Sequence, residues 1–258
     1  MTLGIKKEYG QSNSNSSFSG YSLNTDFNTY MKTRVKEKFD DVNGTESLIS
    51  EFDSLAKTGF DKQQLIDIFE SQQDNTDWRI GEALSECFLE DYENAKFYYD
   101  YSRDAKNPKS NLTGADLVGF SKAEDHCEFL FGEVKTSADK KTPPQVLYGR
   151  SGMTKQLEDI KKVKKIRSAL IKWLGFKVYK LDESEPFRID FMNALEIYIS
   201  SKCNKFRMVG VLVRDIEPND NDLKNRYSSL INNINPFCKL DLFGLYLPIK
   251  IEKLSTAI

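Results

Sequence analysis

The sequence is poor in histidine and in paired cysteines, and this narrows the chemistry that it can support. Its one histidine, His126, would have to carry any Ser-His-Asp or Cys-His mechanism alone, so we interpret it as a loop residue. The four cysteines lie far apart and form no CxxC pair, which argues against a zinc site. Without a secretion signal a disulfide framework is also unexpected, and we predict buried free thiols at Cys87, Cys127, Cys203 and Cys238.

Long hydrophobic runs and an excess of one charge are missing as well. The mean hydropathy is -0.54, and no apolar run approaches the roughly 20 residues of a membrane span. The N-terminus lacks the apolar core of a signal peptide, so we expect a cytoplasmic protein without a membrane partner. Thirty-seven Lys and Arg against 39 Asp and Glu give a formal charge of -2. This excludes a globally basic protein that coats nucleic acid by charge alone, but it leaves a local basic groove open.

Composition along the 258 residues predicts three parts. Residues 1–26 are small and polar, which is typical of a flexible or loosely docked arm. Residues 27–75 show apolar positions at helical spacing, for example Leu48, Phe52 and Leu55, and predict a helical accessory region. Residues 76–258 have the length and patterning of the main domain.

Helices and strands alternate in this main domain. The apolar patterns predict helices at 77–92, 153–174, 187–202 and 220–234 and strands at 114–120, 128–135, 206–216 and 239–249, with a further short strand at 176–181. Gly175 is the expected end of the long helix. This order predicts an α/β fold with a mixed central sheet flanked by helices.

Charged side chains stand within two of the apolar strands. Glu133 and Lys135 are two residues apart, so on a strand both side chains leave the same face. Asp116 lies among apolar residues on the preceding strand and can approach Glu133 if the two strands pair. Two converging carboxylates repel each other unless a cation lies between them, and oxygen ligands favour Mg²⁺ or Mn²⁺.

This pattern resembles the PD-(D/E)xK nuclease superfamily, here as Asp116 followed by Glu133-Val134-Lys135, with Ala115 where the pattern has proline. The resemblance implies a restriction-endonuclease-like α/β/α core and Mg²⁺-dependent hydrolysis of phosphodiester bonds in DNA. It also implies that Asp116, Glu133 and the Val134 carbonyl ligate the metal. Lys135 would then orient or activate the attacking water and stabilise negative charge.

The resemblance supplies two further catalytic candidates. Gly81-Glu82-Ala83-Leu84 is similar to the GE-x-L start of the first core helix in some members, which points to Glu82, although a helical wheel places it nearly opposite the apolar stripe. Glu86, one turn later, is the alternative. Gln156 matches a glutamine that some members carry on the helix after the ExK strand, with Ile160 where a tyrosine often follows.

The combination of GE-x-L, GAD and FGE-x-K is also similar to the nuclease component of Hachiman-type anti-phage systems. That similarity implies a role in anti-phage defence or restriction. The sequence contains no GxxxxGK motif, so any translocation would need a separate helicase or ATPase subunit.

Basic residues near these motifs are candidates for phosphate contacts. Lys140, Lys141 and Arg150 lie on the polar loop after the ExK strand, and Lys161 begins a basic run on the next helix. A plain surface loop and a solvated helix face are the competing interpretations. The aromatic segment 97–101 could stack on bases, but a half-buried strand is the favoured interpretation.

The favoured function is therefore a metal-dependent deoxyribonuclease. Three alternatives stay open. Asp116, Glu133 and Lys135 could form a surface ion-pair group without function, the protein could be a catalytically silent nucleic-acid-binding subunit, or it could be a protein-interaction domain.

Overall fold

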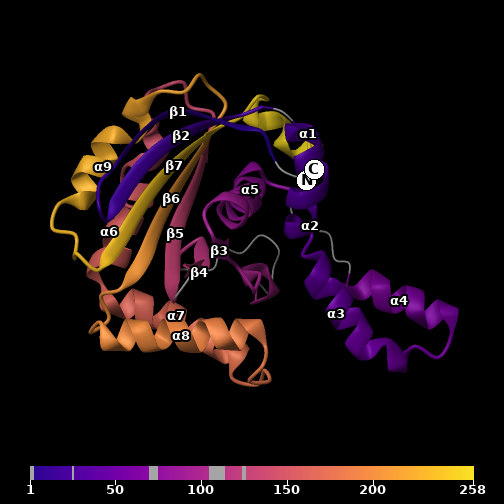
Figure 1. Cartoon of the computed structure of the whole chain (residues 1–258). Coiled ribbons are helices and arrows are strands. Elements are labelled where there is room, and N and C mark those ends of the chain that lie inside the picture. Colours follow the sequence, from indigo (N-terminus) through magenta and orange to yellow (C-terminus); the bar gives the residue numbers. More distant parts are fainter. Residues whose placement is uncertain (1–2, 25, 70–74, 105–113, 124–125) are drawn as a thin grey trace.

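The computed structural model describes residues 3–24, 26–69, 75–104, 114–123 and 126–258. Within these residues seven strands form one mixed sheet with helices on both faces, which confirms the expected fold class (Figure 1). The strand order is β1-β2-β7-β6-β5-β4-β3. The strands are β1 (Ile5–Ser12), β2 (Ser16–Leu23), β3 (Ala95–Lys96), β4 (Leu117–Lys122), β5 (Cys127–Ser137), β6 (Phe206–Arg214) and β7 (Cys238–Tyr246).

The centre of the sheet is parallel and its edges are antiparallel. β5, β6 and β7 run parallel to one another, whereas β4 pairs antiparallel with β5 and β3 antiparallel with β4. All nine residues of β6 are buried, as expected for a parallel strand covered on both faces, and this explains its apolar run over 208–213. The two buried arginines of β6, Arg207 and Arg214, pair with Asp241 and Asp222. Its side chains alternate between the two cores, with Val209 and Val211 in one and Met208 and Leu212 in the other.

Each face of the sheet is covered by its own helices. α5 (Asp77–Tyr92) packs on one face together with the N-terminal helices, and the C-terminal turn η6 (Ile251–Thr256) completes that layer. The other face is covered by α6 (Met153–Lys162), α7 (Lys164–Val178), α8 (Pro186–Ser200) and α9 (Lys224–Ile231). Among the described residues no helix is long and apolar enough to cross a membrane.

A hairpin in the sheet is formed by β1 and β2, so 5–23 is not the flexible or loosely docked arm that was expected over 1–26; residues 1, 2 and 25 lie outside the described residues. β1 and β2 pair antiparallel, and β2 adds to β7 as a parallel neighbour. Phe18 and Leu23 are almost completely buried, and Ser17 donates a hydrogen bond to Asp241 at 2.7 Å. Small residues serve this position because Gly20 lies directly against the ring of Tyr9, where a Cβ would approach within 2.3 Å.

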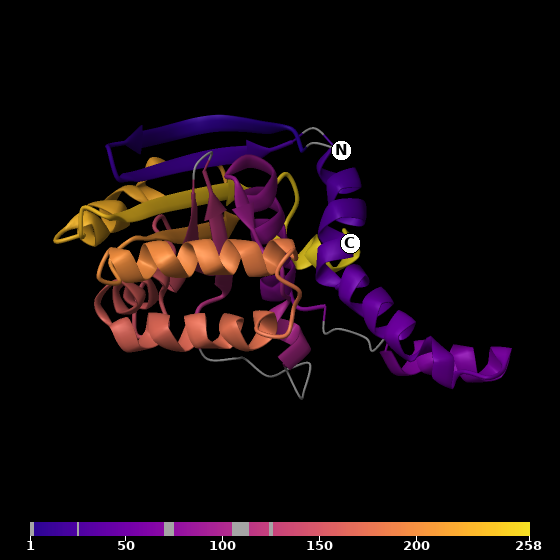
Figure 2. The same cartoon turned by 60° about the horizontal axis from the view of Figure 1, so that its bottom comes forward.

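The following segment is helical, as predicted, but its two halves differ in how they pack. α1 (Phe27–Tyr30), a π-helical turn η1 (Met31–Val35) and α2 (Lys36–Phe39) form one rod that buries Tyr30, Met31 and Val35 beside α5. α3 (Val42–Phe52) and α4 (Gly59–Phe69) form a helical hairpin that projects away from the sheet (Figure 2). None of its described residues is buried.

Several expected element boundaries were wrong. The long helix expected over 153–174 is two helices, because Val163 adopts an extended conformation between α6 and α7. α7 continues past Gly175 to Val178, so the short strand expected at 176–181 does not form. The aromatic segment 97–101 is not a strand either, since β3 ends at Lys96 and a 3-10 turn η3 begins at Tyr101.

Candidate functional site

A cavity of about 770 Å³ opens near the carboxyl end of β5, between α5 on one side and α6 and α7 on the other. Its lining includes the first-choice catalytic and metal-ligand candidates from the sequence, which are Glu82, Asp116, Glu133, Val134, Lys135 and Gln156. These residues come from α5, from the chain before β4, from β5 and from α6.

Asp116 lies directly before β4, beside the part of β5 that extends past β4. β4 begins at Leu117, opposite Gly132, so β5 continues beyond its antiparallel partner. Beyond the end of β4, the Val134 N–H donates to the carboxylate of Asp116, to Oδ2 at 2.9 Å. Because the N–H and C=O of one strand residue point to the same side, the Val134 carbonyl faces this edge as well.

Glu133 and Lys135 share a face of β5, as the two-residue period predicts. Glu133 is 2% exposed, and Lys135 Nζ donates to its Oε1 at 2.5 Å. Burial, together with the nearby charge of Asp116, raises the pKa of Glu133 to about 8. Burial also raises the pKa of Asp116, although the hydrogen bond from Val134 opposes the change. The site therefore holds two carboxyl groups that resist being ionised together.

The ammonium of Lys135 responds in the opposite way. Burial alone would lower its pKa, but the attraction of Glu133 and the hydrogen bond to it outweigh burial, so the pKa of Lys135 is raised. Glu82 adds to this attraction from α5. Lys135 thus stays charged within the cavity.

α5 approaches β5 closely because Gly81 lies against Thr136. A Cβ at Gly81 would come within 2.0 Å of Thr136 Oγ1, so a side chain there would push the helix away. This contact carries the adjacent Glu82 into the cavity, where it is 8% exposed. Glu86 points elsewhere and pairs with Lys38 at 2.9 Å, so of the two glutamates the structure places Glu82 at the site.

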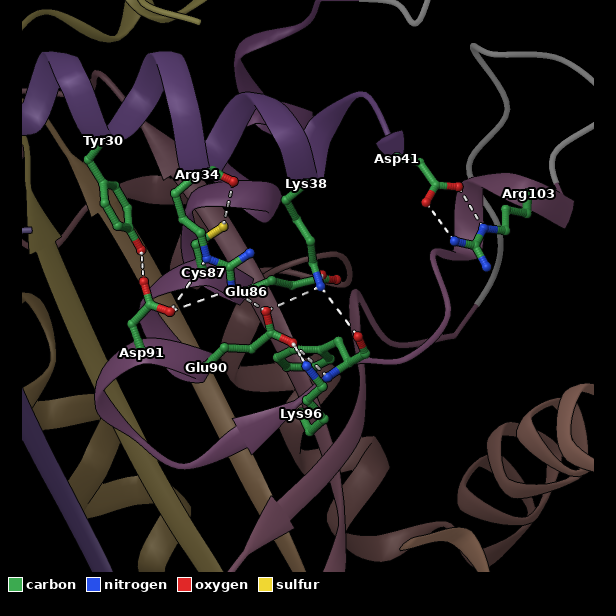
Figure 3. A network of polar contacts seen from close by, with 11 residues as sticks. Tyr30, Arg34, Lys38, Asp41, Glu86, Cys87, Glu90, Asp91, Lys96 and Arg103 are labelled. Atoms are coloured by element: carbon green, nitrogen blue, oxygen red, sulfur yellow. Dashed lines mark hydrogen bonds and ion pairs between the residues drawn. The ribbon is translucent and has the colours of Figure 1, made fainter. Parts of the chain in front are cut away.

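A polar network holds α5 against the N-terminal rod on the side away from the sheet (Figure 3). Tyr30 donates to Asp91 at 2.6 Å, Arg34 to Glu90 at 2.6 Å, and Lys38 pairs with Glu86. Arg103 makes a two-bond ion pair with Asp41, each bond 2.6 Å long, at the start of α3. The helix that carries Glu82 is thus fixed from both sides.

The cavity also contains residues that the sequence patterns did not single out, namely Trp78, Asp104, Ser151 and Trp173. Trp173 Nε1 and Lys177 Nζ both donate to Asp104, the latter at 2.6 Å, and this fixes α7 to the turn η3. Trp78 could have been found, because it lies one helical turn before Glu82 on α5. Asp104 and Trp173 meet only through the tertiary fold.

The basic candidates are distributed differently from the catalytic ones. Lys140, Lys141 and Arg150 are exposed on the segment after β5 and lie outside the cavity lining. Lys161 has a structural contact: its Nζ donates to the carbonyls of Leu230 and Asn232, at 2.7 and 3.1 Å, at the end of α9. The basic run is not a uniform solvated face either, because Arg167 is 5% exposed and donates to the carbonyl of Ile160.

The remaining polar and thiol candidates lie away from the cavity. His126 precedes β5 and pairs with Glu128 at 2.8 Å. The cysteines are free thiols, as expected, and all are buried except Cys203, which is half-buried.

One known protein family matches this chain over nearly its whole length. A family model described as HamA matches residues 5–255. A search of curated proteins finds no match. The match spans the hairpin, the helical rod, every strand of the sheet and the cavity, so it concerns the whole fold. The chain therefore belongs to the HamA family, protein A of the Hachiman anti-phage system.

Proposed function

We propose that this HamA-family chain is a metal-dependent nuclease that hydrolyses phosphodiester bonds of DNA during anti-phage defence. One observation carries the proposal: Asp116, Glu133 and Lys135 meet inside a cavity, although 16 residues separate Asp116 from Glu133 in the sequence. Burying two acids and a lysine together costs free energy, and such placements concentrate at functional sites. The alternative is a surface ion pair without function. In such a pair the acid would be exposed, whereas Glu133 is only 2% exposed.

The donor groups at the site fit a hard divalent cation. Asp116 and Glu133 offer carboxylate oxygens, and the Val134 carbonyl faces the same edge. In the part of the chain that the structure describes, no group of three or more His, Cys, Asp or Glu side chains is placed to hold a metal. Mg²⁺ commonly uses one or two carboxylates and completes its shell with water and substrate phosphate, which matches this set. Burial raises the pKa of both acids, and the charge of Asp116 adds to the rise at Glu133; a bound cation would favour their ionised forms.

The chain's own residues have distinct roles in this proposal. A bound Mg²⁺ or Mn²⁺ would polarise the scissile phosphate and lower the pKa of a water. Lys135 keeps its proton on Nζ and supplies positive charge beside the developing negative charge of the phosphate. Glu82 and Gln156 lie on the cavity walls, where a carboxylate and an amide can orient the water. The exposed Lys140, Lys141 and Arg150 are then candidates for contacts with phosphates outside the cavity.

The proposed chemistry separates cutting from movement along DNA. In Hachiman systems HamA works with a helicase, HamB, and this chain lacks a GxxxxGK motif. We therefore assign translocation and unwinding to the partner and cleavage to the cavity beside β5 of this chain.

A cleavage assay tests the proposal. Linear, circular and single-stranded DNA are incubated with the protein, alone and with its helicase partner, in Mg²⁺, Mn²⁺ or EDTA. Glu133→Gln and Lys135→Ala are expected to lose at least about a hundredfold in rate, the effect typical of removing a group that stabilises transition-state charge. Glu128→Gln removes a carboxylate from the same strand outside the cavity and should cleave like the wild type.

A second measurement does not depend on cleavage. Mg²⁺ or Mn²⁺ should raise the thermal unfolding temperature of the wild type and of Glu128→Gln, but not that of Glu133→Gln. Cleavage that persists in both cavity variants, or metal stabilisation that is unchanged in Glu133→Gln, would contradict the assignment of the site.

A further inference from the structure

The helix beside the cavity is strongly basic in a protein whose net charge is slightly negative. Residues 160–181, which include all of α7, contain eight lysines and arginines and no aspartate or glutamate. Arg167 is buried and Lys177 is paired with Asp104, but Lys164, Lys165, Lys172 and Lys180 are exposed. Acidic residues resume only at Asp182, after the helix has ended. The exposed side of α7 therefore attracts a polyanion.

Two aromatic rings lie on this same exposed side. Phe176 is 62% and Tyr179 60% exposed, and their ring centroids are 6.3 Å apart. Each ring has an ammonium above it: Lys172 Nζ is 5.7 Å from the Phe176 centroid, and Lys180 Nζ is 5.4 Å from the Tyr179 centroid. The two neighbouring rings form an exposed apolar patch flanked by lysines, and such a combination of rings and positive charge is typical of surfaces that stack nucleic-acid bases.

The strip formed by Lys172, Phe176, Tyr179 and Lys180, called here the α7 strip, adjoins the cavity. Trp173 follows Lys172 directly and precedes Phe176 by three residues, nearly one helical turn, and its ring lines the cavity wall. A chain bound along the strip would thus pass Trp173 to reach Asp116 and Glu133.

We propose that the α7 strip binds a single-stranded segment of nucleic acid, with phosphates on the lysines and bases stacked on Phe176 and Tyr179. The inference rests on the proposed nuclease function and adds to it a substrate class for the same site. Paired bases in a duplex hide their faces, so stacking on these rings requires an unpaired strand. A membrane is disfavoured, because the wide apolar face of α7, with Ile171, Leu174 and Val178, is already buried in the core.

Fluorescence anisotropy in EDTA tests binding without cleavage. The probes are a labelled 20-nucleotide single strand, the matching duplex, and vesicles that contain anionic lipid. The wild type should bind the single strand more tightly than the duplex. Phe176→Ala and Tyr179→Ala should each weaken single-strand binding by about tenfold, the effect of losing one stacked base, and should leave duplex binding nearly unchanged.

Matched variants separate stacking from charge and from general surface effects. Phe237→Ala removes a ring that is equally exposed (61%) but precedes β7 at the opposite end of the parallel strands, so binding should not change. Phe176→Trp should restore binding. The double variant Lys172→Gln/Lys180→Gln should reduce the slope of log affinity against log salt by about 1.4, from roughly 0.7 per phosphate contact on a single strand.

The outcomes distinguish this inference from the proposed function. Three results would contradict single-strand binding by the α7 strip. They are equal affinity for single strand and duplex, loss of binding in Phe237→Ala as large as in Phe176→Ala, and ring-dependent binding of vesicles. If the protein binds single strands through these rings but never cleaves DNA, the proposed binding strip is supported and the proposed nuclease function is contradicted.

Discussion

Replacing Glu86 with glutamine should flatten the pH dependence of folding stability. Glu86 lies between α2 and α5, where its carboxylate pairs with Lys38 at 2.9 Å and its side chain is 14% exposed (Figure 3). Burial raises the pKa of Glu86 to about 7 from an ordinary 4.5, and the attraction of Lys38 only partly opposes the change. The folded protein therefore binds a proton at this site over a range of pH in which the unfolded chain has released it.

The sign and size of the effect follow from linkage. Because the pKa of Glu86 is higher in the folded state, its contribution to the free energy of unfolding is fully present below about pH 4.5. This contribution is lost as the pH rises through about 7. Each tenfold change in proton affinity is worth about 1.4 kcal/mol, so Glu86 should lower the free energy of unfolding by roughly 3 kcal/mol across this range. Glutamine is neutral throughout and can still accept a hydrogen bond from Lys38.

Urea unfolding at a series of pH values, followed by tryptophan fluorescence, measures this contribution. Trp78 on α5 reports on the helix itself. Between about pH 5 and 8 the wild type should lose about 2–3 kcal/mol more stability than Glu86→Gln. Glu37→Gln, an exposed substitution on α2, is the control and should keep the wild-type dependence. Parallel curves for the wild type and Glu86→Gln would refute the argument, because the raised pKa would then have no energetic consequence.

Three further predictions concern the scaffold. Gly81→Ala should destabilise the protein by about 1–3 kcal/mol in urea unfolding and slow cleavage, because the new methyl meets Thr136 Oγ1; Thr136→Ala in the same chain should restore part of both. Deleting residues 3–24 uncovers an edge of β7 and should yield aggregated protein in size-exclusion chromatography. Arg214→Met should cost about 3–5 kcal/mol in urea unfolding because Asp222, fully buried 3.0 Å away, loses its charged partner and keeps the Tyr246 hydroxyl; Arg214→Met/Asp222→Asn should recover part of it.

The sheet and the pair of strands at the site were predictable because their physical causes are local. Most residues of β6 and β7 are buried, so the apolar stretches 209–213 and 242–247 predict strands without any knowledge of their neighbours. The shared face of Glu133 and Lys135 follows from the period of a strand. Asp116 stood out because an acid among apolar residues on the neighbouring segment requires a partner.

The N-terminal hairpin could not be predicted because its stabilising contacts are remote in the sequence. Most of β1 is exposed, and β2 is rich in serine and glycine, which is also the composition of a disordered segment. Its order comes from pairing with β7, more than 200 residues later, and from the hydrogen bond between Ser17 and Asp241. Composition carries no information about such a partner.

The placement of Glu82 shows a different limit of pattern analysis. A helical wheel assumes one buried face, and on that assumption Glu82 points away from the core. α5, however, is covered by the sheet on one side and by the N-terminal rod on the other, so its residues from Arg79 to Ser85 are all buried. Its position opposite the apolar stripe therefore leaves Glu82 inside the protein, in the cavity that the α7 residue Trp173 and the turn residue Asp104 help to close.

Ion pairs between side chains connect α2 to α5, the helix that carries Glu82 into the cavity. Lys38 on α2 lies between Glu86 and Glu90 on α5, one and two turns beyond Glu82. If α2 moved away, both acids would lose the lysine that pairs with them. The position of α2 and the position of Glu82 are therefore energetically coupled. By this criterion the rod over 27–39 belongs to the scaffold of the candidate site, and only the hairpin of α3 and α4 projects from it.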